Sequence, residues 1–582
     1  MKYIFLVSTI ILLFSFSVFY LSHEKKIKIK DKLISFIIRH SSIIVGCLLS
    51  FGFILPYLFV PFGLDFTDTF YSLNNYKQLQ ASEMMPLSHY LGNIIYKICN
   101  GELLYIRIVG TFIYQLIIII PIIFLLPWRK YILQFSALFA LLSVFLTMTN
   151  SHIFCYDNFS SLFIITTFIF YVKYIQNNNY LNLVLLSIFA GFSVLCRFPN
   201  VVMVVFVIIL LSVNAFAIKF KSKELFLKLI FDNIIFLTLT IFTTFLVKKF
   251  IDSQIAVSLS ENVMSTTTTS NSHSLSILLN TYWRHITEVF GYINLFTTLI
   301  ISISYFIELK QFIKFKPFLY GLIFLSLFGW VFTHSYFLFN ISFILSSYLI
   351  ILLMIGSYKE FKTKKSFSFV ILAVSIFFFS LISAAGSNTG LLKMTNYVFF
   401  PFVLYFTWPY LSKSVKSFTL ILFAVLVVYA PFAKKYFTFQ DAGIFKTTTS
   451  EIKSSKLKHI YTTPERTKFV NDIIHFANVA KLNNKSYLFV GNCGQIQIFE
   501  FILGFKRSAC NTDFNWVPGD KGYNILVSDY LKTNKENYII FIVDYPENDK
   551  NNSYDIETSF VKMNYKLELI DKGYRIYKLL DN

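Results

Sequence analysis

Long, nearly uninterrupted blocks of apolar residues constrain the fold of this chain more than any other feature. They recur from the N-terminus to about residue 435, with short polar segments between them. A helix needs about 20 mostly apolar residues to cross the hydrocarbon core of a membrane, which is about 30 Å thick. Only 14% of the residues are charged, against about 25% in soluble proteins. We therefore expect a polytopic α-helical membrane protein and exclude a large soluble enzyme, a disordered chain and a small disulfide scaffold.

The apolar blocks predict about 14 transmembrane helices. The first block resembles a secretory signal peptide, but its apolar run is long, a single Lys precedes it and no clean cleavage site follows. We therefore interpret it as a span. The expected spans cover residues 3–22, 42–61, 104–126, 131–149, 159–176, 182–196, 199–218, 229–247, 289–308, 318–333, 337–356, 366–385, 396–411 and 418–433.

Lys and Arg between the blocks predict the orientation. If the 24–39 loop faces the cytoplasm, the inside loops hold 22 Lys and Arg and the outside connections hold 7. Cytoplasmic loops of membrane proteins carry such an excess. We therefore expect a multi-pass protein of the cytoplasmic (inner) membrane, with the 62–103 loop and the C-terminal region outside. The net charge of +21 follows from these clusters, so we expect membrane lipid, and not nucleic acid, as a partner.

The C-terminal region differs in character from the preceding chain, because its charges are denser and its apolar runs are shorter. The patterns predict an amphipathic helix at 465–482 and strands at 486–491, 537–544 and 574–579. Strands that alternate with helices favour a two-layer α/β domain. We expect residues 1–435 to form the membrane module and residues 436–582 to form an extracytoplasmic domain.

Two patterns in this region leave alternatives open. Cys493 and Cys510 lie 17 residues apart; in an oxidising compartment they could form a disulfide worth about 3 kcal/mol, and the alternative is two unpaired thiols. The glycines of the 491–494 turn follow a predicted strand, as in a phosphate-binding loop. That turn lacks the fuller glycine pattern of such loops, so an ordinary strand-to-helix turn is the simpler interpretation.

The first outside loop, residues 62–103, carries two carboxylates just beyond the second span. Asp65 and Asp68 lie three residues apart among aromatic residues, and such residues share a face if the segment is helical. Burial beside hydrocarbon raises the pKa of a carboxyl group, which makes it a better base near neutral pH. The alternative, which the motif alone favours, is that Asp68 caps the helix that follows it. The later part of the loop has the apolar spacing of helices that lie in the membrane interface.

Four further positions at the outside ends of the spans are candidates for chemistry. Asp157 is the only acid of its connection, and its alternative role is to cap the fifth span. Arg197 interrupts an apolar run of about 37 residues; it and Arg107 are either site residues or interfacial residues whose charge reaches the lipid head groups. Lys393 closes a small, polar and flexible loop.

The two acids of the first loop, together with this topology, resemble the GT-C fold glycosyltransferases, which take a sugar from a polyprenyl-phosphate carrier. The similar groups are the protein O-mannosyltransferases, the aminoarabinose transferases and the rhizobial lipopolysaccharide galacturonosyltransferases. Their first external loop opens with roughly Asp-Glu-x-x-Tyr, whose acid is the catalytic base. Asp68 and Tyr71 match the acid and the tyrosine, whereas Thr67 stands where the preceding acid is expected. Which of Asp65 and Asp68 would act as the base therefore stays open.

The resemblance implies roles for the other candidates. Asp157 corresponds to the acid of the second external loop, and the stretch from Gly191 to Arg197 corresponds to a glycine-containing span that ends in a basic residue. Arg107 matches an Arg early in the helix after the first loop and, with Tyr71, would position that loop. A soluble external C-terminal domain completes the GT-C-like layout, so the resemblance implies an enzyme.

The chemistry of such a transfer fits these residue types. A polyprenyl phosphate is a good leaving group, so one carboxylate acting as a general base is sufficient, and a single inverting displacement is the natural mechanism. The departing phosphate gains charge, and Arg197 and Lys393 are candidates to bind it. The acceptor would be a glycan, a lipid or a protein. His152, His285 and His334 are interpreted as interfacial residues, and no metal or other cofactor is assigned.

Other functions stay open at this point. A transporter or flippase of lipid-linked saccharides is expected to carry charges near the membrane midplane and often has two related halves; here the charges gather at one face and no internal repeat is found. A polysaccharide polymerase or ligase also uses long outside loops, where several Arg are expected. A purely structural membrane protein does not explain acids at the start of two outside connections.

Overall fold

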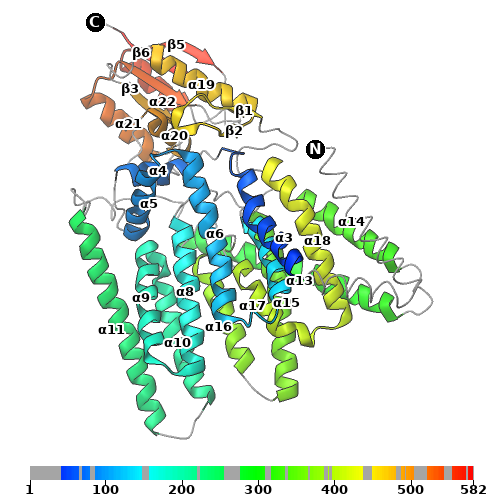
Figure 1. Cartoon of the computed structure of the whole chain (residues 1–582). Coiled ribbons are helices and arrows are strands. Elements are labelled where there is room, and N and C mark those ends of the chain that lie inside the picture. Colours follow the sequence, from blue (N-terminus) through cyan, green and yellow to red (C-terminus); the bar gives the residue numbers. More distant parts are fainter. Residues whose placement is uncertain are drawn as a thin grey trace.

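The computed structural model shows a bundle of long helices with a smaller α/β unit at one end (Figure 1). We call this unit, which begins at residue 449, the C-terminal unit, and we call the end of the bundle that it covers the capped end. The structure describes residues 41–64, 68–78, 85–146, 156–218, 223–254, 275–308, 316–334, 339–364, 368–385, 391, 396–436, 449–479, 487–491, 493–503, 521–542, 554–571 and 574–580.

Apolar helices make up the bundle. Among the described residues, 6 are long and apolar enough to cross a membrane: Ser41–Phe59, Leu103–Leu125, Tyr156–Asn177, Ile230–Gln254, Leu279–Tyr305 and Phe343–Thr363. The chain is therefore a helical protein of membrane-spanning character. The bundle contains α3 (Ser41–Ile54), α6 (Leu103–Leu125), α7 (Ile132–Leu146), α8 (Tyr156–Asn177), α9 (Tyr180–Cys196), α10 (Val201–Ile218), α11 (Lys223–Gln254), α13 (Leu275–Glu308), α14 (Lys316–His334), α15 (Phe339–Lys364), α16 (Ser368–Ile382), α17 (Phe400–Thr407) and α18 (Lys413–Tyr436).

These helices coincide in position with the expected spans from 42–61 onward, but their lengths differ. The expected span 3–22 lies outside the described residues, so the total of about 14 spans stays a prediction. Helices α11 and α13 run well beyond the expected spans, so Lys248, Lys249 and Arg284 lie in helices and not in loops. The hydropathy pattern could not show this, because hydropathy marks the apolar part of a helix and not its polar ends.

Proline marks three points at which the α-helical backbone changes to a 3-10 turn. The 3-10 helices η1 (Leu55–Phe59), η2 (Phe198–Asn200) and η7 (Trp408–Tyr410) each carry Pro in the first turn. Proline lacks a backbone N–H and is therefore placed at least cost in a first turn, although α6 contains Pro121 in its interior. In this way η2 divides the long apolar run into α9 and α10, as the sequence predicts.

The bundle core is dense where α8, α9 and α11 meet. A Cβ at Gly191 of α9 would lie 3.2 Å from the Thr240 carbonyl oxygen of α11, so glycine at this position allows the two helices to approach closely. The Thr240 hydroxyl lies 3.3 Å from the Ser187 carbonyl oxygen of α9. Contacts between small residues of this kind are typical of helices packed within a membrane.

The C-terminal unit contains a four-stranded sheet of order β3-β4-β6-β5. Strands β3 and β4 are parallel, and β6 runs antiparallel to both β4 and β5. Every residue of β3 and β4 is buried, as their continuous apolar sequences predict. The unit contains β1 (Ser450–Glu451), η8 (Ser455–Leu457), β2 (Tyr461–Thr462), α19 (Pro464–Val479), β3 (Tyr487–Gly491), α20 (Cys493–Leu503), α21 (Lys521–Thr533), β4 (Tyr538–Ile542), α22 (Tyr554–Lys562), β5 (Tyr565–Asp571) and β6 (Tyr574–Leu579).

The helix expected at 465–482 and the three expected strands are confirmed as α19, β3, β4 and β6. Strand β5 was not expected. Its sequence, YKLELID, is rich in the good helix formers Leu, Lys and Glu. It is a strand because it pairs with β6 at the edge of the sheet, and that contact is not visible in local sequence.

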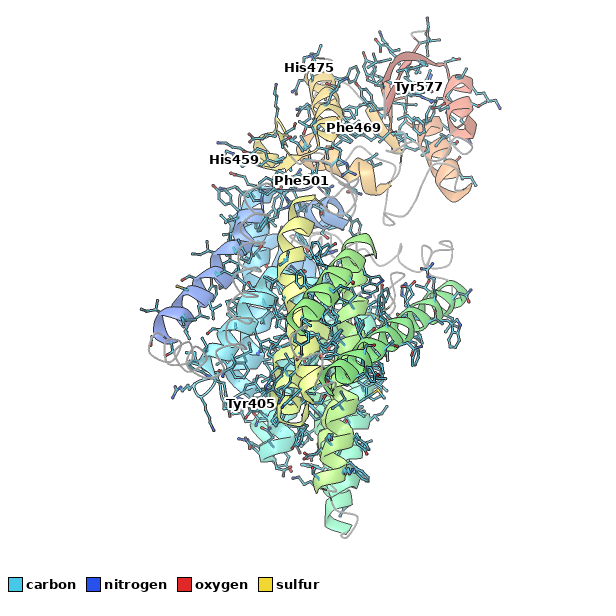
Figure 2. All side chains as sticks on the ribbon, turned by 90° about the vertical axis from the view of Figure 1, so that its right-hand side faces the viewer. Tyr405, His459, Phe469, His475, Phe501 and Tyr577 are labelled. Atoms are coloured by element: carbon cyan, nitrogen blue, oxygen red, sulfur yellow. The ribbon has the colours of Figure 1, made fainter. Side chains whose placement is uncertain are left out.

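Two helices of the first outside loop, α4 (Asp68–Gln78) and α5 (Pro86–Ile98), lie between the bundle and the C-terminal unit (Figure 1). One buried apolar cluster runs through all three parts and includes Phe70 of α4, Leu87 of α5, Cys196 of α9 and Phe501 of α20. Figure 2 shows Phe501 where the C-terminal unit meets the bundle, whereas Tyr405 lies far from it, towards the opposite end. The C-terminal unit is thus packed on the bundle through a shared core.

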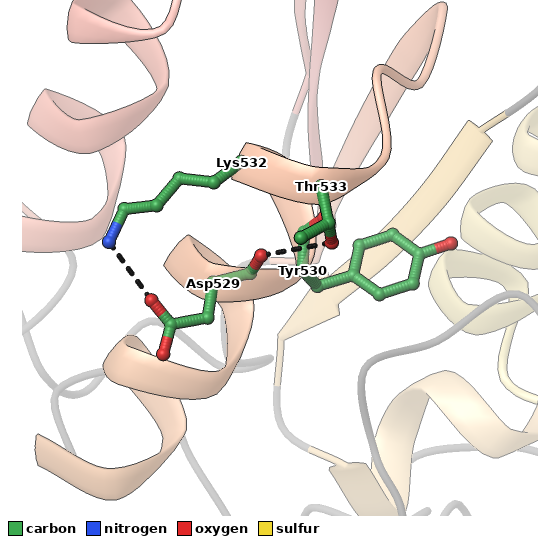
Figure 3. A network of polar contacts seen from close by, with 4 residues as sticks. All are labelled: Asp529, Tyr530, Lys532 and Thr533. Atoms are coloured by element: carbon green, nitrogen blue, oxygen red, sulfur yellow. Dashed lines mark hydrogen bonds and ion pairs between the residues drawn. The ribbon is translucent and has the colours of Figure 1, made fainter.

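The surface of the C-terminal unit also contains an exposed ion pair that contributes little to stability. In α21, the Lys532 ammonium lies 2.9 Å from an Asp529 carboxylate oxygen, and both side chains are more than half exposed (Figure 3). Exposed pairs of this kind contribute roughly 0–1 kcal/mol. Asp529 is therefore a suitable control position for substitutions of acids elsewhere.

Candidate functional site at the capped end

The segment just before the first-loop acids is held by a buried arginine of α6. The Arg107 guanidinium donates hydrogen bonds to the Val60 carbonyl at 3.1 Å and to the Gly63 carbonyl at 2.9 Å. Arg107 is only 2% exposed, so its charge does not reach the lipid head groups, and the interfacial alternative is wrong. Charge-assisted hydrogen bonds are about twice as strong as neutral ones. Arg107 therefore fixes the backbone at the entry to the loop.

The C-terminal unit holds the same segment from the other side. The buried Arg466 of α19 donates to the Leu64 carbonyl at 2.8 Å. Gly63 N–H donates to the Tyr461 carbonyl, and Tyr461 N–H donates to the Pro61 carbonyl, both at 2.8 Å. Residues 60–64 are therefore clamped between a bundle helix and the C-terminal unit.

The two candidate bases follow this clamped segment directly. Asp65 lies outside the described residues. Asp68 is the first residue of α4, and its side chain also lies outside them. Because α4 is helical from Asp68, positions 68 and 71 share one face. The half-buried Tyr71 and Asn75 occupy this face, whereas the adjacent Ser72 is buried.

A second face of α4 docks on α20. The Asn74 amide donates to the Gln497 backbone carbonyl at 2.9 Å and to its side-chain oxygen at 2.7 Å. One turn earlier, the Phe70 ring lies 5.4 Å from the Phe501 ring. Asn74 and Gln497 are both buried, so this contact satisfies polar groups that would otherwise be costly to bury.

Two lysines lie at the same junction. The Lys456 ammonium donates to the Phe501 carbonyl at 2.7 Å. Burial, followed by the positive charge of Lys77, lowers the pKa of Lys456 from 10.5 to about 8. Burial also lowers the pKa of Lys77, although the Glu500 carboxylate opposes this shift. The junction therefore holds cationic groups that are partly desolvated.

Helix α5 of the first outside loop packs next to Arg197, the candidate arginine between the expected spans 182–196 and 199–218. The buried Ser88 hydroxyl of α5 donates to the Cys196 carbonyl at 2.9 Å, and Cys196 is the last residue of α9. Close packing of α5 on α4 requires Gly92, because a Cβ there would lie 2.4 Å from ring atoms of Tyr76. The loop therefore contacts the residue that directly precedes Arg197.

Arg197 is buried, with 5% exposure, so the interfacial alternative is wrong for this residue too. Its guanidinium donates to the Ser383 carbonyl, at the end of α16, at 2.9 Å. Among the described residues, no carboxylate pairs with Arg197. The Asn200 amide, three residues later, donates to the Ser160 hydroxyl of α8 at 2.7 Å, which ties the turn to α8.

Asp157 lies in the first turn of α8 and is partly exposed. The helix begins at Tyr156, so the expected N-cap role does not describe its position; a carboxylate in the first turn still interacts favourably with the helix dipole. Next to it, the Asn158 side-chain oxygen accepts a hydrogen bond from the Tyr114 hydroxyl of α6 at 2.7 Å.

The structure brings several predicted positions to one end of the molecule. Phe70, Phe159 and Cys196 belong to one apolar cluster, and each lies within two residues of Asp68, Asp157 or Arg197. Lys393 lies outside the described residues. Cys493 begins α20, but its side chain and all of Cys510 lie outside them, so the disulfide stays a prediction. Within the described part of the chain, no group of three or more His, Cys, Asp or Glu could hold a metal ion.

Sequence reasoning missed the residues that join the two parts of the chain. Arg466 contacts a carbonyl 402 positions away, and Asn74 contacts a glutamine 423 positions away. No local pattern marks them, because their role exists only once α19 and α20 pack on the first loop.

Comparison with known protein families gave no match to this chain. Comparison with curated protein sequences gave none either. The function is therefore argued from the capped end itself.

Proposed function

We propose that the chain is a membrane glycosyltransferase of the GT-C type, which moves a sugar from a polyprenyl-phosphate donor to an acceptor at the outer face of the cytoplasmic membrane. The acceptor hydroxyl belongs to a glycan, a lipid or a protein. The lipid phosphate reaches the site from the bilayer, and its polyprenyl tail stays in the hydrocarbon beside the apolar helices. The distribution of Lys and Arg supports the placement of the capped end outside.

The clamp on residues 60–64 carries this proposal. Arg107 and Arg466, one from the bundle and one from the C-terminal unit, bind backbone carbonyls directly before Asp65 and Asp68. A general base must be held within hydrogen-bond reach of the proton that it removes. Burying two arginines at the entry to a loop costs free energy, which a connection without a function would not require. A loop that must hold a general base in place does require such a fixed entry.

The reaction needs few protein groups. Asp65 or Asp68 takes the proton of the acceptor hydroxyl as its oxygen attacks the anomeric carbon. The bond from that carbon to the phosphate oxygen breaks, and the phosphate leaves with the electron pair, so the configuration is inverted. Arg197 and Lys393 stabilise the charge that develops on the phosphate. Asp157 supports the site from the first turn of α8.

Substitution of the two acids tests the proposal. Asp65→Asn and Asp68→Asn, alone and together, are assayed for sugar transfer in membranes that contain the full chain. A general base is worth about 10²–10⁴-fold in rate, so at least one variant should lose about that factor. Asp529→Asn, at the exposed pair of α21, is the matched control and should keep full activity.

Full activity of the double variant would remove both acids from the mechanism. Movement of a lipid-linked saccharide across sealed vesicles, without any glycosyl product, would instead identify a transporter and overturn the transferase.

A further inference from the structure

The turn that ends α16 is held from two sides, one of them by Arg197, and its surroundings point to a further residue of the donor site. Arg197 donates to the Ser383 carbonyl at 2.9 Å. The Tyr282 hydroxyl of α13 donates to the carbonyl of the next residue, Ala384. Three segments far apart in the sequence therefore meet at two consecutive carbonyls.

His285 lies three residues after Tyr282, on the same face of α13. It is 3% exposed, and its ring lies 5.1 Å from the ring of Phe343. Phe343, Ala384 and Leu391 form one small buried cluster, with Tyr282 packed against it. The histidine is thus buried between α13 and α15, one helical turn from the tyrosine that holds the turn after α16.

The imidazole and the guanidinium both keep unused hydrogen-bonding capacity here. Nδ1 of His285 is buried and has no hydrogen-bond partner among the described residues. Arg197 uses one donor on Ser383, out of the five that a guanidinium offers, and meets no carboxylate in the described part of the chain. An unpaired buried polar atom costs about 1–3 kcal/mol, and a buried cation costs more unless an anion is near. A ligand with several acceptor oxygens and a negative charge would satisfy both groups.

We propose that His285 is a further binding residue for the phosphate group of a lipid-linked substrate, and that it acts beside Arg197 at the Ser383–Ala385 turn. This inference rests on the proposed function and adds a residue to its donor site. A phosphate fits because its oxygens accept hydrogen bonds from a guanidinium and an imidazole together. A lipid phosphate fits better than a free one because α13 and α15 are apolar and Trp283, beside Tyr282, is 68% exposed on the outer surface of the bundle.

Binding by the full chain in nanodiscs tests this. Decaprenyl phosphate, decaprenol and inorganic phosphate are titrated separately against the wild type and the variants. His285→Phe keeps a ring for packing but has no nitrogen, and should weaken decaprenyl phosphate binding about tenfold, as for loss of one hydrogen bond to a charged group. His285→Asn, whose amide lies near the Nδ1 position, should stay within about threefold of the wild type. Phe290→Ala, at another exposed position of α13, is the matched control and should bind as the wild type does.

The outcomes separate the two claims. Wild-type affinity in His285→Phe, together with weak binding by Arg197→Gln, would overturn the role of His285 and leave the proposed function standing. Equal losses for decaprenol and decaprenyl phosphate would also overturn it, because the histidine would then contact hydrocarbon. If the wild type binds decaprenyl phosphate no better than decaprenol, both claims fail. If His285→Phe does not fold, His285→Gln replaces it, because the Gln amide lies near the position of Nε2 and not of Nδ1. His285→Gln should then bind decaprenyl phosphate more weakly than His285→Asn. Equal binding by the two variants would overturn the role of Nδ1.

Discussion

Replacing Arg107 by Met is the sharpest test of how the first outside loop is held. Arg107 is almost fully buried, and its two hydrogen bonds to Val60 and Gly63 measure 3.1 and 2.9 Å. A hydrogen bond to a charged group is worth about 1.5–3 kcal/mol. Methionine keeps much of the apolar stem but leaves both carbonyls without this donor.

The expected loss is less than the sum of two such bonds, because Arg466 and Tyr461 still hold the neighbouring residues. We estimate about 3 kcal/mol of local stability, which is about a hundredfold rise in local opening at 1.36 kcal/mol per factor of ten. Arg107→Lys should fall between the wild type and Arg107→Met, because lysine keeps the charge but not the two-pronged geometry of the guanidinium.

Hydrogen exchange followed by mass spectrometry measures this directly. Peptides that cover residues 60–78 should exchange about a hundredfold faster in Arg107→Met, whereas β3 of the C-terminal unit should be unchanged. Arg284→Met, at an exposed position of α13, is the matched control and should alter neither region. An unchanged rate at 60–78, or an equal rise in β3, would refute the argument that Arg107 clamps this loop.

Two further predictions concern the junction of the loop with its surroundings. Gly92→Ala should destabilise the chain by roughly 1–3 kcal/mol, because its Cβ would overlap the Tyr76 ring. Gly291→Ala, which has open space around it, is the control and should be neutral or stabilising by up to about 1 kcal/mol. Thermal unfolding in detergent compares the two variants, and equal effects would contradict the packing argument. Burial lowers the pKa of Lys456 from 10.5 to about 8, so between about pH 8 and 10.5 the folded chain binds fewer protons at this lysine than the unfolded chain does. The cost of burying the charged lysine therefore destabilises the folded chain fully below pH 8 and fades as the pH rises through this window. The thermal midpoint should therefore rise with pH there, and Lys456→Met should flatten the rise; an identical slope in the variant would show that other groups cause it.

The element positions were largely readable from sequence because each depends on local chemistry. Apolar blocks predicted the bundle helices, and the Pro199 break after Arg197 correctly separated α9 from α10. Continuous apolar runs predicted β3 and β4. The polar ends of α11 and α13 and the edge strand β5 were missed, because neither depends on local hydropathy.

The candidate site was readable only in part. Asp68, Asp157 and Arg197 were marked by being polar beside apolar spans, and each lies at the capped end, next to the shared apolar cluster. The sequence left open whether Arg107 and Arg197 face lipid or protein. Their burial decides this, because a buried guanidinium requires acceptors, and backbone carbonyls supply them.

The amino-acid sequence alone determined that this chain forms apolar helices, roughly where along the chain they lie, and that an α/β unit follows them, because hydropathy and proline act on each segment separately. Only the tertiary structure decided which buried donors meet which carbonyls: Arg466 and Leu64 are 402 positions apart, and Arg197 and Ser383 are 186 apart. Such pairs form when whole helices pack, and the cost of burying a charge then favours arrangements in which a buried guanidinium meets an acceptor.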